Sequence, residues 1–153
     1  MTDGTQAAIG LRLEHTFEAP REEVFDAWTN PEVLRRWWAA GPDWDTPAAE
    51  VDLREGGRYR LSMHNPETDD VHTVGGEYRE IRRPERLVYT WAWEGPSSEP
   101  NETVVTVEFH DREGTTEVVL MHEGFSSEES RGAHEHGWHA VLDNLRARVL
   151  GGA

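Results

Sequence analysis

A single apolar stripe near the C-terminus does most to restrict the folds open to this chain. On a helix, five side chains would share one face: Trp138, Val141, Leu142, Leu145 and Val149. A capping-box sequence, Ser126–Glu129, predicts where the helix begins, and Gly151–Gly152 predicts where it ends. At about 1.5 Å per residue this helix is about 35 Å long, enough to cross a whole domain. Gly132 and Gly137 within it allow close backbone approach or leave room inside.

Most of the chain before this helix is patterned as β-strands, with apolar and polar residues in alternation. The predicted strands are Leu11–Phe17, Thr46–Leu53, Gly57–His64, Val71–Ile81, Leu87–Trp93, Val105–Phe109 and Thr116–Glu123. Turn sequences separate the last six, which predicts an antiparallel sheet. Gly75–Gly76 interrupts one strand and predicts a bulge or sharp bend there.

Two short helices are predicted between the first and second strands. Pro20 opens the first of them. Asn30–Pro31–Glu32 supplies the N-cap, the N1 proline and an acidic N2 residue of the other. The fold class is therefore α+β: an antiparallel sheet of six to seven strands, two short helices after the first strand, and a long C-terminal helix.

The charge balance excludes several classes of partner. Thirty carboxylates face fifteen cations, giving a net charge of −15, and every cation is arginine. Such a charge repels phosphate backbones and anionic lipids, so we expect no binding to nucleic acid or membrane. The absence of cysteine excludes disulfides and thiolate chemistry. We expect a cytoplasmic protein with a flexible tail over residues 1–10 and a single domain over residues 11–150.

A set of motifs along the chain resembles one known family. These motifs are Phe17–Pro20, Val24–Thr29, Asn30–Trp38, Asp52–Tyr59, Gly76–Ile81, Pro84–Trp91, His122–Phe125 and Gly137–Leu145. Together they resemble the family of the activator of Hsp90 ATPase homologues, within the START/Bet v 1-like superfamily. The resemblance implies the helix-grip fold, in which a strongly curved antiparallel sheet surrounds the long C-terminal helix and a cavity. None of the motifs is a catalytic signature.

The resemblance implies a binding function more than a reaction. Related folds bind lipids, hormones, flavonoids or polyketides beneath the long helix, and some cyclise or dehydrate polyketides there. Our first hypothesis is a module that binds a small, mostly apolar molecule and uses no cofactor. Two alternatives stay open: an enzyme of the polyketide cyclase or hydratase type, and a co-chaperone or other protein-interaction domain. A protein partner or a homodimer also stays open.

Seven tryptophans in 153 residues favour an aromatic-lined cavity. The residues predicted to line it are Trp38, Trp44, Tyr59, Leu61, Met63, Tyr78, Tyr89, Trp91, Trp93, Val107, Leu120, His122, His134, Trp138, Val141 and Leu142. Arg58, Tyr89 and His122 are predicted to orient the ligand through polar contacts. The alternative is a filled core, because aromatic residues at strand or helix spacing usually pack as core. A slip of one residue would turn each strand's inward set outward.

Two other groups of side chains could carry chemistry. His136 and His139 lie one helical turn apart near His134, but no third metal ligand can be identified, so no metal site is predicted. Asp52 and Glu77 could join the polar groups named above in a proton relay. Carboxylates and arginines in strands more often form solvated cross-strand pairs, and no catalytic residue is predicted.

The segment Trp37–Trp44 contains three tryptophans among glycine, proline and alanine. We interpret it as a lid over the mouth of the cavity, because it is rich in small residues and leads into the strand at Thr46. It could instead form an exposed apolar patch for a protein partner, or pack plainly against the body of the domain.

Overall fold

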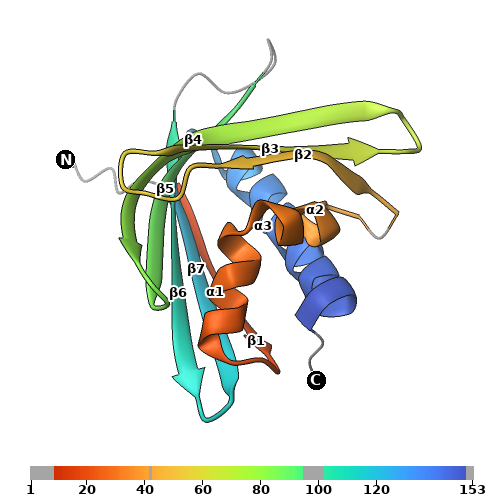
Figure 1. Cartoon of the computed structure of the whole chain (residues 1–153). Helices are drawn as coiled ribbons and strands as arrows, with labels where there is room; N and C mark the ends of the chain where they lie inside the picture. The colour runs from red at the N-terminus through yellow and green to blue at the C-terminus, as the bar shows by residue number, and fades with distance from the viewer. Residues whose placement is uncertain (1–8, 42, 95–101, 151–153) are drawn as a thin grey trace, which may run out of the picture.

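The computed structural model describes residues 9–41, 43–94 and 102–150, and in these residues a seven-stranded antiparallel sheet surrounds a long helix (Figure 1). The strands are β1 (Ile9–Phe17), β2 (Asp45–Val51), β3 (Arg58–Asn65), β4 (Asp70–Arg82), β5 (Arg86–Trp93), β6 (Thr103–Arg112) and β7 (Thr115–Phe125). The helices are α1 (Arg21–Thr29), α2 (Pro31–Trp37) and α3 (Glu128–Leu145), and a π-helical turn, η1 (Arg146–Leu150), follows α3. The predicted α+β helix-grip architecture is confirmed.

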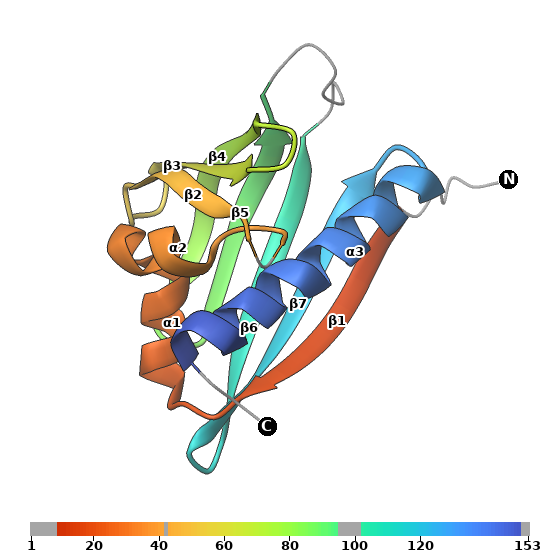
Figure 2. The same cartoon turned by 90° about the vertical axis from the view of Figure 1, so that its right-hand side faces the viewer.

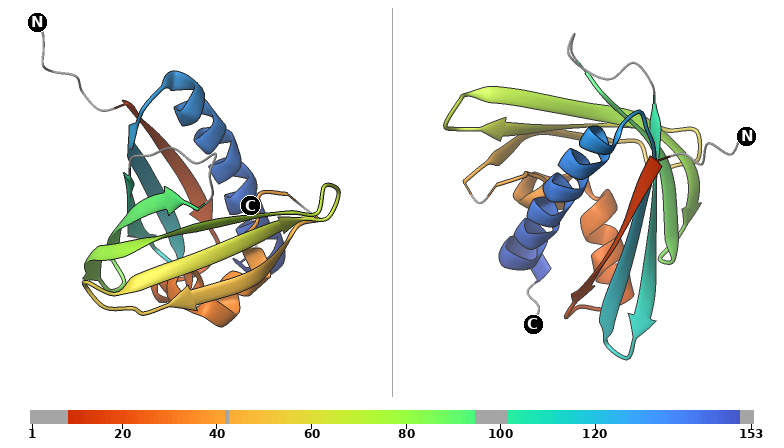
Figure 3. Two further views of the ribbon diagram at one scale, coloured as in Figure 1. Left: turned by 90° about the horizontal axis from the view of Figure 1, so that it is seen from above. Right: turned by 180° about the vertical axis from the view of Figure 1, so that it is seen from behind.

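The strand order is β1-β7-β6-β5-β4-β3-β2, so the first strand pairs with the last and not with the second. The sheet is strongly curved: β2, β3 and β4 extend over one end of α3, while β1, β6 and β7 run along its side (Figures 2 and 3). Helices α1 and α2 occupy the remaining opening of the curve (Figure 1). A straight helix cannot touch a curved sheet along its whole length, and this geometry leaves space between α3 and the strands at the β3–β5 end.

Only some of the predicted boundaries of the domain, the loop and the last helix can be compared with the structure. Residues 1–8, the loop 95–101 and the glycine pair 151–152 lie outside the described residues. Ile9 and Gly10 already belong to β1, where they pair with Phe125 and Glu123 of β7. The predicted tail therefore extended two residues too far.

Of the two alternatives predicted at Gly75 and Gly76, a bulge or a sharp bend, the bulge is not formed. The β3–β4 register is continuous through both glycines, and the irregularity lies farther along, between Tyr78 and Glu80 in the β4–β5 pairing. Gly76 serves close approach, because a Cβ atom there would lie 2.0 Å from the carbonyl oxygen of Thr90 on β5. The glycine pair thus marks backbone crowding at the point where the sheet curves.

The ends of the helices follow from local chemistry. The Asn30 side chain accepts a hydrogen bond from the Glu32 amide at 3.0 Å, which confirms the predicted N-cap of α2. The N-cap of α3 is Ser127, whose hydroxyl accepts from the Ser130 amide at 3.1 Å, so the predicted capping box began one residue too early. At the other end, the π-helical turn η1 adds a residue to the helical period, and Leu150 is buried there.

Candidate ligand-binding pocket

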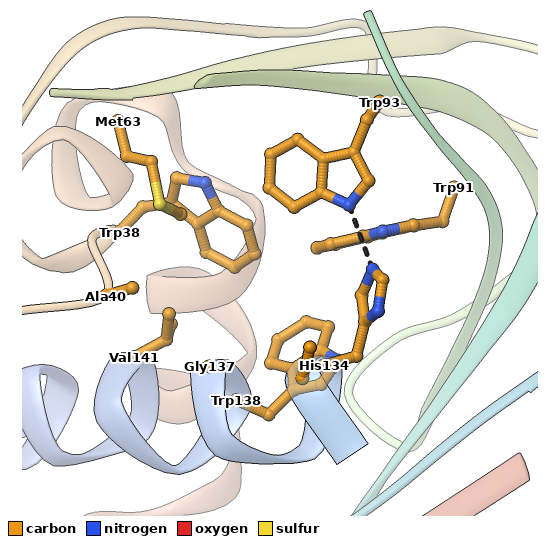
Figure 4. A pocket seen from close by; sticks show the side chains of 10 residues that line it. Trp38, Ala40, Met63, Trp91, Trp93, His134, Gly137, Trp138 and Val141 are labelled. Carbon is orange, nitrogen blue, oxygen red and sulfur yellow. Dashed lines mark hydrogen bonds between the residues drawn. The ribbon is translucent and has the colours of Figure 1, made fainter. Parts of the chain in front are cut away.

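A pocket of about 260 Å³ lies between α3, β3, β5 and the segment that follows α2 (Figure 4). Its lining is almost entirely apolar and aromatic: Trp38, Ala40, Met63, Trp91, Trp93, Ala133, His134, Gly137, Trp138 and Val141. Helix α3 supplies half of these residues, from three successive turns of one face. The pocket therefore occupies the space that the curvature of the sheet leaves beside the helix.

Three buried tryptophans from different elements form the inner wall of the pocket. Their ring centroids are 5.8 Å apart for Trp38 and Trp91, 5.5 Å for Trp38 and Trp138, and 5.1 Å for Trp91 and Trp138. The two contacts of Trp38 are edge-to-face, an arrangement that aromatic quadrupoles favour. The wall is thus an aromatic surface to which the segment after α2, strand β5 and helix α3 each contribute one ring.

A hydrogen bond between two side chains joins the sheet to the helix at the rim. The indole N–H of Trp93 on β5 donates to Nε2 of His134 on α3 at 2.9 Å (Figure 4). Nδ1 of His134 lies 2.8 Å from the Ser130 carbonyl oxygen. Because a carbonyl only accepts, Nδ1 carries the proton and Nε2 is free to accept from the indole. Both rings are only partly buried, so this bridge lies at the edge of the pocket.

His122 lies behind the aromatic wall, fully buried on β7. Its Nδ1 accepts from the Trp138 indole N–H at 3.0 Å, and its Nε2 donates to the Thr103 hydroxyl at 2.8 Å. The Thr103 hydroxyl in turn donates to the Trp91 carbonyl at 3.2 Å. Burial, reinforced by the nearby His134, lowers the pKa of His122 to about 2, so the ring is neutral. His122 therefore supports two wall residues and does not itself line the pocket.

A second, much smaller hollow of about 10 Å³ adjoins the same aromatic wall. Its lining residues are Trp28, Leu34, Trp38, Tyr59, Leu61, Tyr78, Tyr89 and Trp91. The Tyr59 hydroxyl donates to the Thr90 carbonyl, and the Tyr89 hydroxyl accepts from the Trp28 indole at 3.2 Å. Burial raises the pKa of Tyr59, Tyr78 and Tyr89, so all three phenols stay protonated. Trp38 and Trp91 line both hollows.

The structure brings most, but not all, of the predicted lining residues to these two hollows. Those around the larger pocket are Trp38, Met63, Trp91, Trp93, His134, Trp138 and Val141. Those around the smaller hollow, apart from the shared tryptophans, are Tyr59, Leu61, Tyr78 and Tyr89. Val107, Leu120 and Leu142 pack in the closed core instead. Trp44 lies outside both hollows and stacks on His72 with ring centroids 6.2 Å apart.

The predicted polar orienting role is wrong for Arg58. Its neighbour Tyr59 faces the interior of the sheet, so the alternation of the strand places Arg58 on the outer face, where it is exposed. Tyr89 and His122 are on the inner side, but the hydrogen bonds described above already engage the Tyr89 hydroxyl and both His122 nitrogens.

Two lining residues, Ala40 and Ala133, were not predicted. Alanine carries no distinctive signal in a sequence, and these positions matter because their side chains leave space. Gly137 gave a clearer signal as a glycine inside a helix. Among the described residues, and apart from the nearby backbone of α3 itself, no atom lies within 4 Å of a Cβ built at Gly132 or Gly137, so neither glycine serves close approach of another element. Gly137 leaves room on the pocket side of α3.

The segment after α2 is pinned to the body of the domain. Asn144 of α3 is buried, and its amide donates to the carbonyls of Ala39 at 2.8 Å and Gly41 at 2.9 Å. Trp37 and Trp38 are 0% and 2% exposed, so the hypothesis of an exposed patch at these two rings is wrong. They are buried because α2 and its C-cap lie in the opening of the curved sheet (Figure 2), where Leu34 of α2 is buried as well.

The groups considered for metal binding or proton transfer are dispersed. His139 approaches His15 of β1 instead of His134. The distance between Nδ1 of His139 and Nε2 of His15 is 3.0 Å. Within residues 9–41, 43–94 and 102–150, no cluster of three or more histidine or acidic side chains could hold a metal ion. Asp52 pairs with Arg54 at the surface. Glu77 lies near Arg79, also at the surface, so the relay envisaged from the sequence is not assembled.

Known proteins are similar to this chain in sequence and in fold. The model of the family described as "Activator of Hsp90 ATPase homolog 1-like protein" matches residues 18–149. A solved protein of Chromobacterium violaceum is 25% identical with a TM-score of 0.81, covering 90% of this chain and 94% of that chain. The AHSA1 protein of Silicibacter pomeroyi is 26% identical with a TM-score of 0.78, covering 91% and 96%.

An AHSA1-like protein of Aeromonas hydrophila is 27% identical with a TM-score of 0.75, and the match covers 91% of this chain and 90% of that chain. A search among functionally curated proteins gave no match. In the described part of the chain, no helix is both long enough and apolar enough to cross a membrane.

Proposed function

Because this chain belongs to the family of activator of Hsp90 ATPase homolog 1-like proteins, which has the helix-grip fold, we propose that it binds a small, mostly apolar molecule in the pocket beside α3. The observation that supports the proposal is the pocket itself: about 260 Å³ in volume and lined by four tryptophans, one methionine, one valine, one histidine and small residues. Small-molecule sites are typically concave and apolar with few polar groups, and this pocket has that composition.

Apolar burial supplies the affinity in this proposal. Each Å² of apolar ligand surface removed from water contributes about 25 cal/mol. The wall is preorganised, because the rings of Trp38, Trp91 and Trp138 pack on one another and His122 accepts a hydrogen bond from the Trp138 indole behind them. Little ordering is therefore required when a ligand enters.

Gly137→Leu is expected to weaken binding of an apolar probe at least tenfold while leaving the protein folded. The new side chain would enter open space, since nothing lies within 4 Å of a Cβ at Gly137, and would occupy the pocket. Replacing a helical glycine also favours the helix by up to about 1 kcal/mol. The measurement is titration with N-phenyl-1-naphthylamine, a neutral fluorophore, together with thermal unfolding.

Gly132→Leu is the matched control. Gly132 lies on the same helix, also has no atom within 4 Å of its Cβ, and does not line the pocket. It gains the same helix propensity and should bind the probe as the unmodified protein does. Equal loss in both variants, or no uptake of the probe by the unmodified protein, would contradict the proposal. Native mass spectrometry of freshly purified protein tests independently for a co-purified small molecule.

A further inference from the structure

A separate hollow of about 220 Å³, which we call the arginine hollow, lies at the end of β5 away from the ligand-binding pocket. The start of α1, the turn between β4 and β5, and β6 surround it at one end of the molecule (Figure 1). Its lining residues are Arg21, Arg82, Glu85, Arg86, Glu108, Phe109 and His110. It shares none of these residues with the pocket or with the smaller hollow beside the aromatic wall.

The arginine hollow carries a positive charge in a strongly acidic protein. Its arginines outnumber its glutamates by three to two, whereas the whole chain has a net charge of −15. Arg82 and Arg86 flank the turn between β4 and β5, which also contains Arg83. Acidic residues are twice as numerous as basic ones in this chain, so a surplus of arginine in one concave site favours the local binding of a negative charge.

Two carboxylates near the arginine hollow are already engaged. Glu108 accepts from the Nη1 group of Arg86 at 3.1 Å, and its other oxygen lies 3.1 Å from Nε2 of His110. Glu80, which does not line the hollow, has its oxygens 3.4 Å from Nε of Arg86 and 3.6 Å from Nε of Arg82. These contacts hold the two arginines of the turn in place beside the hollow.

Arg21, the first residue of α1, has no such partner. Among residues 9–41, 43–94 and 102–150, its guanidinium makes no hydrogen bond and no ion pair, although the residue is only partly exposed. Its Nε is enclosed without an acceptor, so a ligand in the hollow would reach the two Nη groups. Buried arginines are normally paired, because the guanidinium has five N–H donors and a permanent charge. Arg21 therefore offers an unused cationic fork in the lining.

From this arrangement we propose that the arginine hollow binds an oxyanion group, a carboxylate or a phosphate, of a small molecule. The Nη groups of Arg21 donate to the oxyanion, and Arg82 and Arg86 add positive charge. A planar guanidinium matches both groups through two parallel hydrogen bonds. The volume of about 220 Å³ is below the roughly 300 Å³ at which sites for drug-sized ligands begin, which favours a compact anion. The net charge of −15 repels nucleic acids and other polyanions.

The direct test is an NMR titration of the ¹⁵N-labelled full chain at constant pH and ionic strength. The probes are inorganic phosphate, benzoate, and benzamide, which has the shape of benzoate without its charge. At least one of the two anions should bind saturably and shift the amide signals of Arg21, Arg86 and His110 together with the Nε–H signal of Arg21. Benzamide should shift none of them. The anion that binds more tightly identifies carboxylate or phosphate as the group recognised.

Three variants locate the bound anion. Arg21→Gln should weaken binding about tenfold, the effect of losing charge-assisted hydrogen bonds. Glu85→Gln removes an exposed carboxylate from the lining and should strengthen binding about twofold. Arg58→Gln is the matched control, because it removes the same charge from an exposed position on the outer face of the sheet, and it should leave the Kd within about twofold. None of the three replaced side chains forms an ion pair within the described residues, so each variant should fold.

Equal weakening by Arg21→Gln and Arg58→Gln would show that the anions respond only to net charge, and the proposed site would be wrong. Weaker binding by Glu85→Gln, shifts of the same signals by benzamide, or no saturable shift at Arg21 with either anion would also overturn it. N-phenyl-1-naphthylamine should bind equally with and without phosphate, since the pocket and the arginine hollow share no lining residue. Competition between the two would place phosphate in the pocket instead. The arginine site and the proposed function therefore stand or fail separately.

Discussion

Acidification from about pH 7.5 to about pH 5 is expected to lower the free energy of unfolding by about 2 kcal/mol through His122 alone. His122 is fully buried, and burial lowers its pKa from 6.5 to about 2 in the folded protein. In the unfolded chain it titrates normally and takes up a proton below about pH 6.5. The unfolded state then binds more protons than the folded state, so stability falls as the pH falls.

The pH window follows from the two pKa values. Above about pH 6.5 both states hold a neutral ring and the contribution of His122 is fully present. Below it, about 1.4 kcal/mol is lost per pH unit, down toward the folded pKa of about 2. Burial gives His15 a lowered pKa and therefore the same sign, whereas the carboxylates of Asp69 and Asp45 raise the pKa of His64, which gives the opposite sign.

Urea unfolding at several pH values, compared with His122→Gln, isolates the contribution of this residue. Glutamine can accept from Trp138 and donate to Thr103 but does not titrate, so the difference in slope between the two proteins belongs to His122. His136→Gln, at an exposed position of α3, controls for the loss of a histidine as such. Identical pH slopes in the unmodified protein and His122→Gln would refute the prediction.

The same titration should leave the pocket of the folded protein unchanged. With a folded pKa of about 2, His122 stays neutral down to about pH 5, so its Nδ1 still accepts from the Trp138 indole. Binding of N-phenyl-1-naphthylamine to the folded protein is therefore expected to stay constant between about pH 7.5 and about pH 5 while the free energy of unfolding falls.

Trp37→Ala is expected to lower the free energy of unfolding by about 3–5 kcal/mol. Trp37 is fully buried, and its ring packs on Trp28 and Trp38 with centroids 5.3 and 5.8 Å apart. Its indole also donates to the Ala27 carbonyl at 3.0 Å, which would lose this partner. The cavity left behind Trp38 should let that ring move, so weaker probe binding is expected as well.

Trp44→Ala is the matched control, because it removes the same side chain from a partly exposed site seven residues along the chain. It should cost less than about 1 kcal/mol, as surface substitutions usually do. Trp37→Phe serves if the alanine variant does not fold, with a smaller loss in the same direction. Similar losses at Trp37 and Trp44 in chemical denaturation would show that burial of Trp37 is not what matters.

Much of the pocket lining could be predicted from the sequence, because the periodicities of strands and helices indicate which side chains share a face. Tyr89, Trp91 and Trp93 of β5 were assigned to one face by alternation, and the lining residues Trp138 and Val141 of α3 by helical spacing. The same alternation, applied consistently, would have placed Arg58 outward, since its neighbour Tyr59 was predicted to face inward. The wrong prediction for Arg58 was based on the polar chemistry of its side chain and not on the alternation of the strand.

Periodicity does not indicate the distance between the inward face of a strand and the inward face of the helix opposite it. Val107, Leu120 and Leu142 follow the same patterns as Met63 and Val141, yet the first three fill the closed core while the other two line the pocket. The difference depends on where the curved sheet diverges from α3, which is a property of the whole assembly. Ala40 and Ala133 were missed for the same reason, because their role is the space beside them.

By itself, the order of elements and their apolar faces determined the helix-grip architecture, since a long amphipathic helix and seven alternating strands have few ways to bury their apolar sides together. Tertiary structure alone decided which tryptophan N–H groups found acceptors. Trp93 and Trp138 met histidines from distant elements, and Trp38 and Trp91 met none within the described residues. Hydrogen bonds require two atoms within about 3.5 Å in the right direction, and no local pattern in a sequence fixes that distance between residues brought together only by folding.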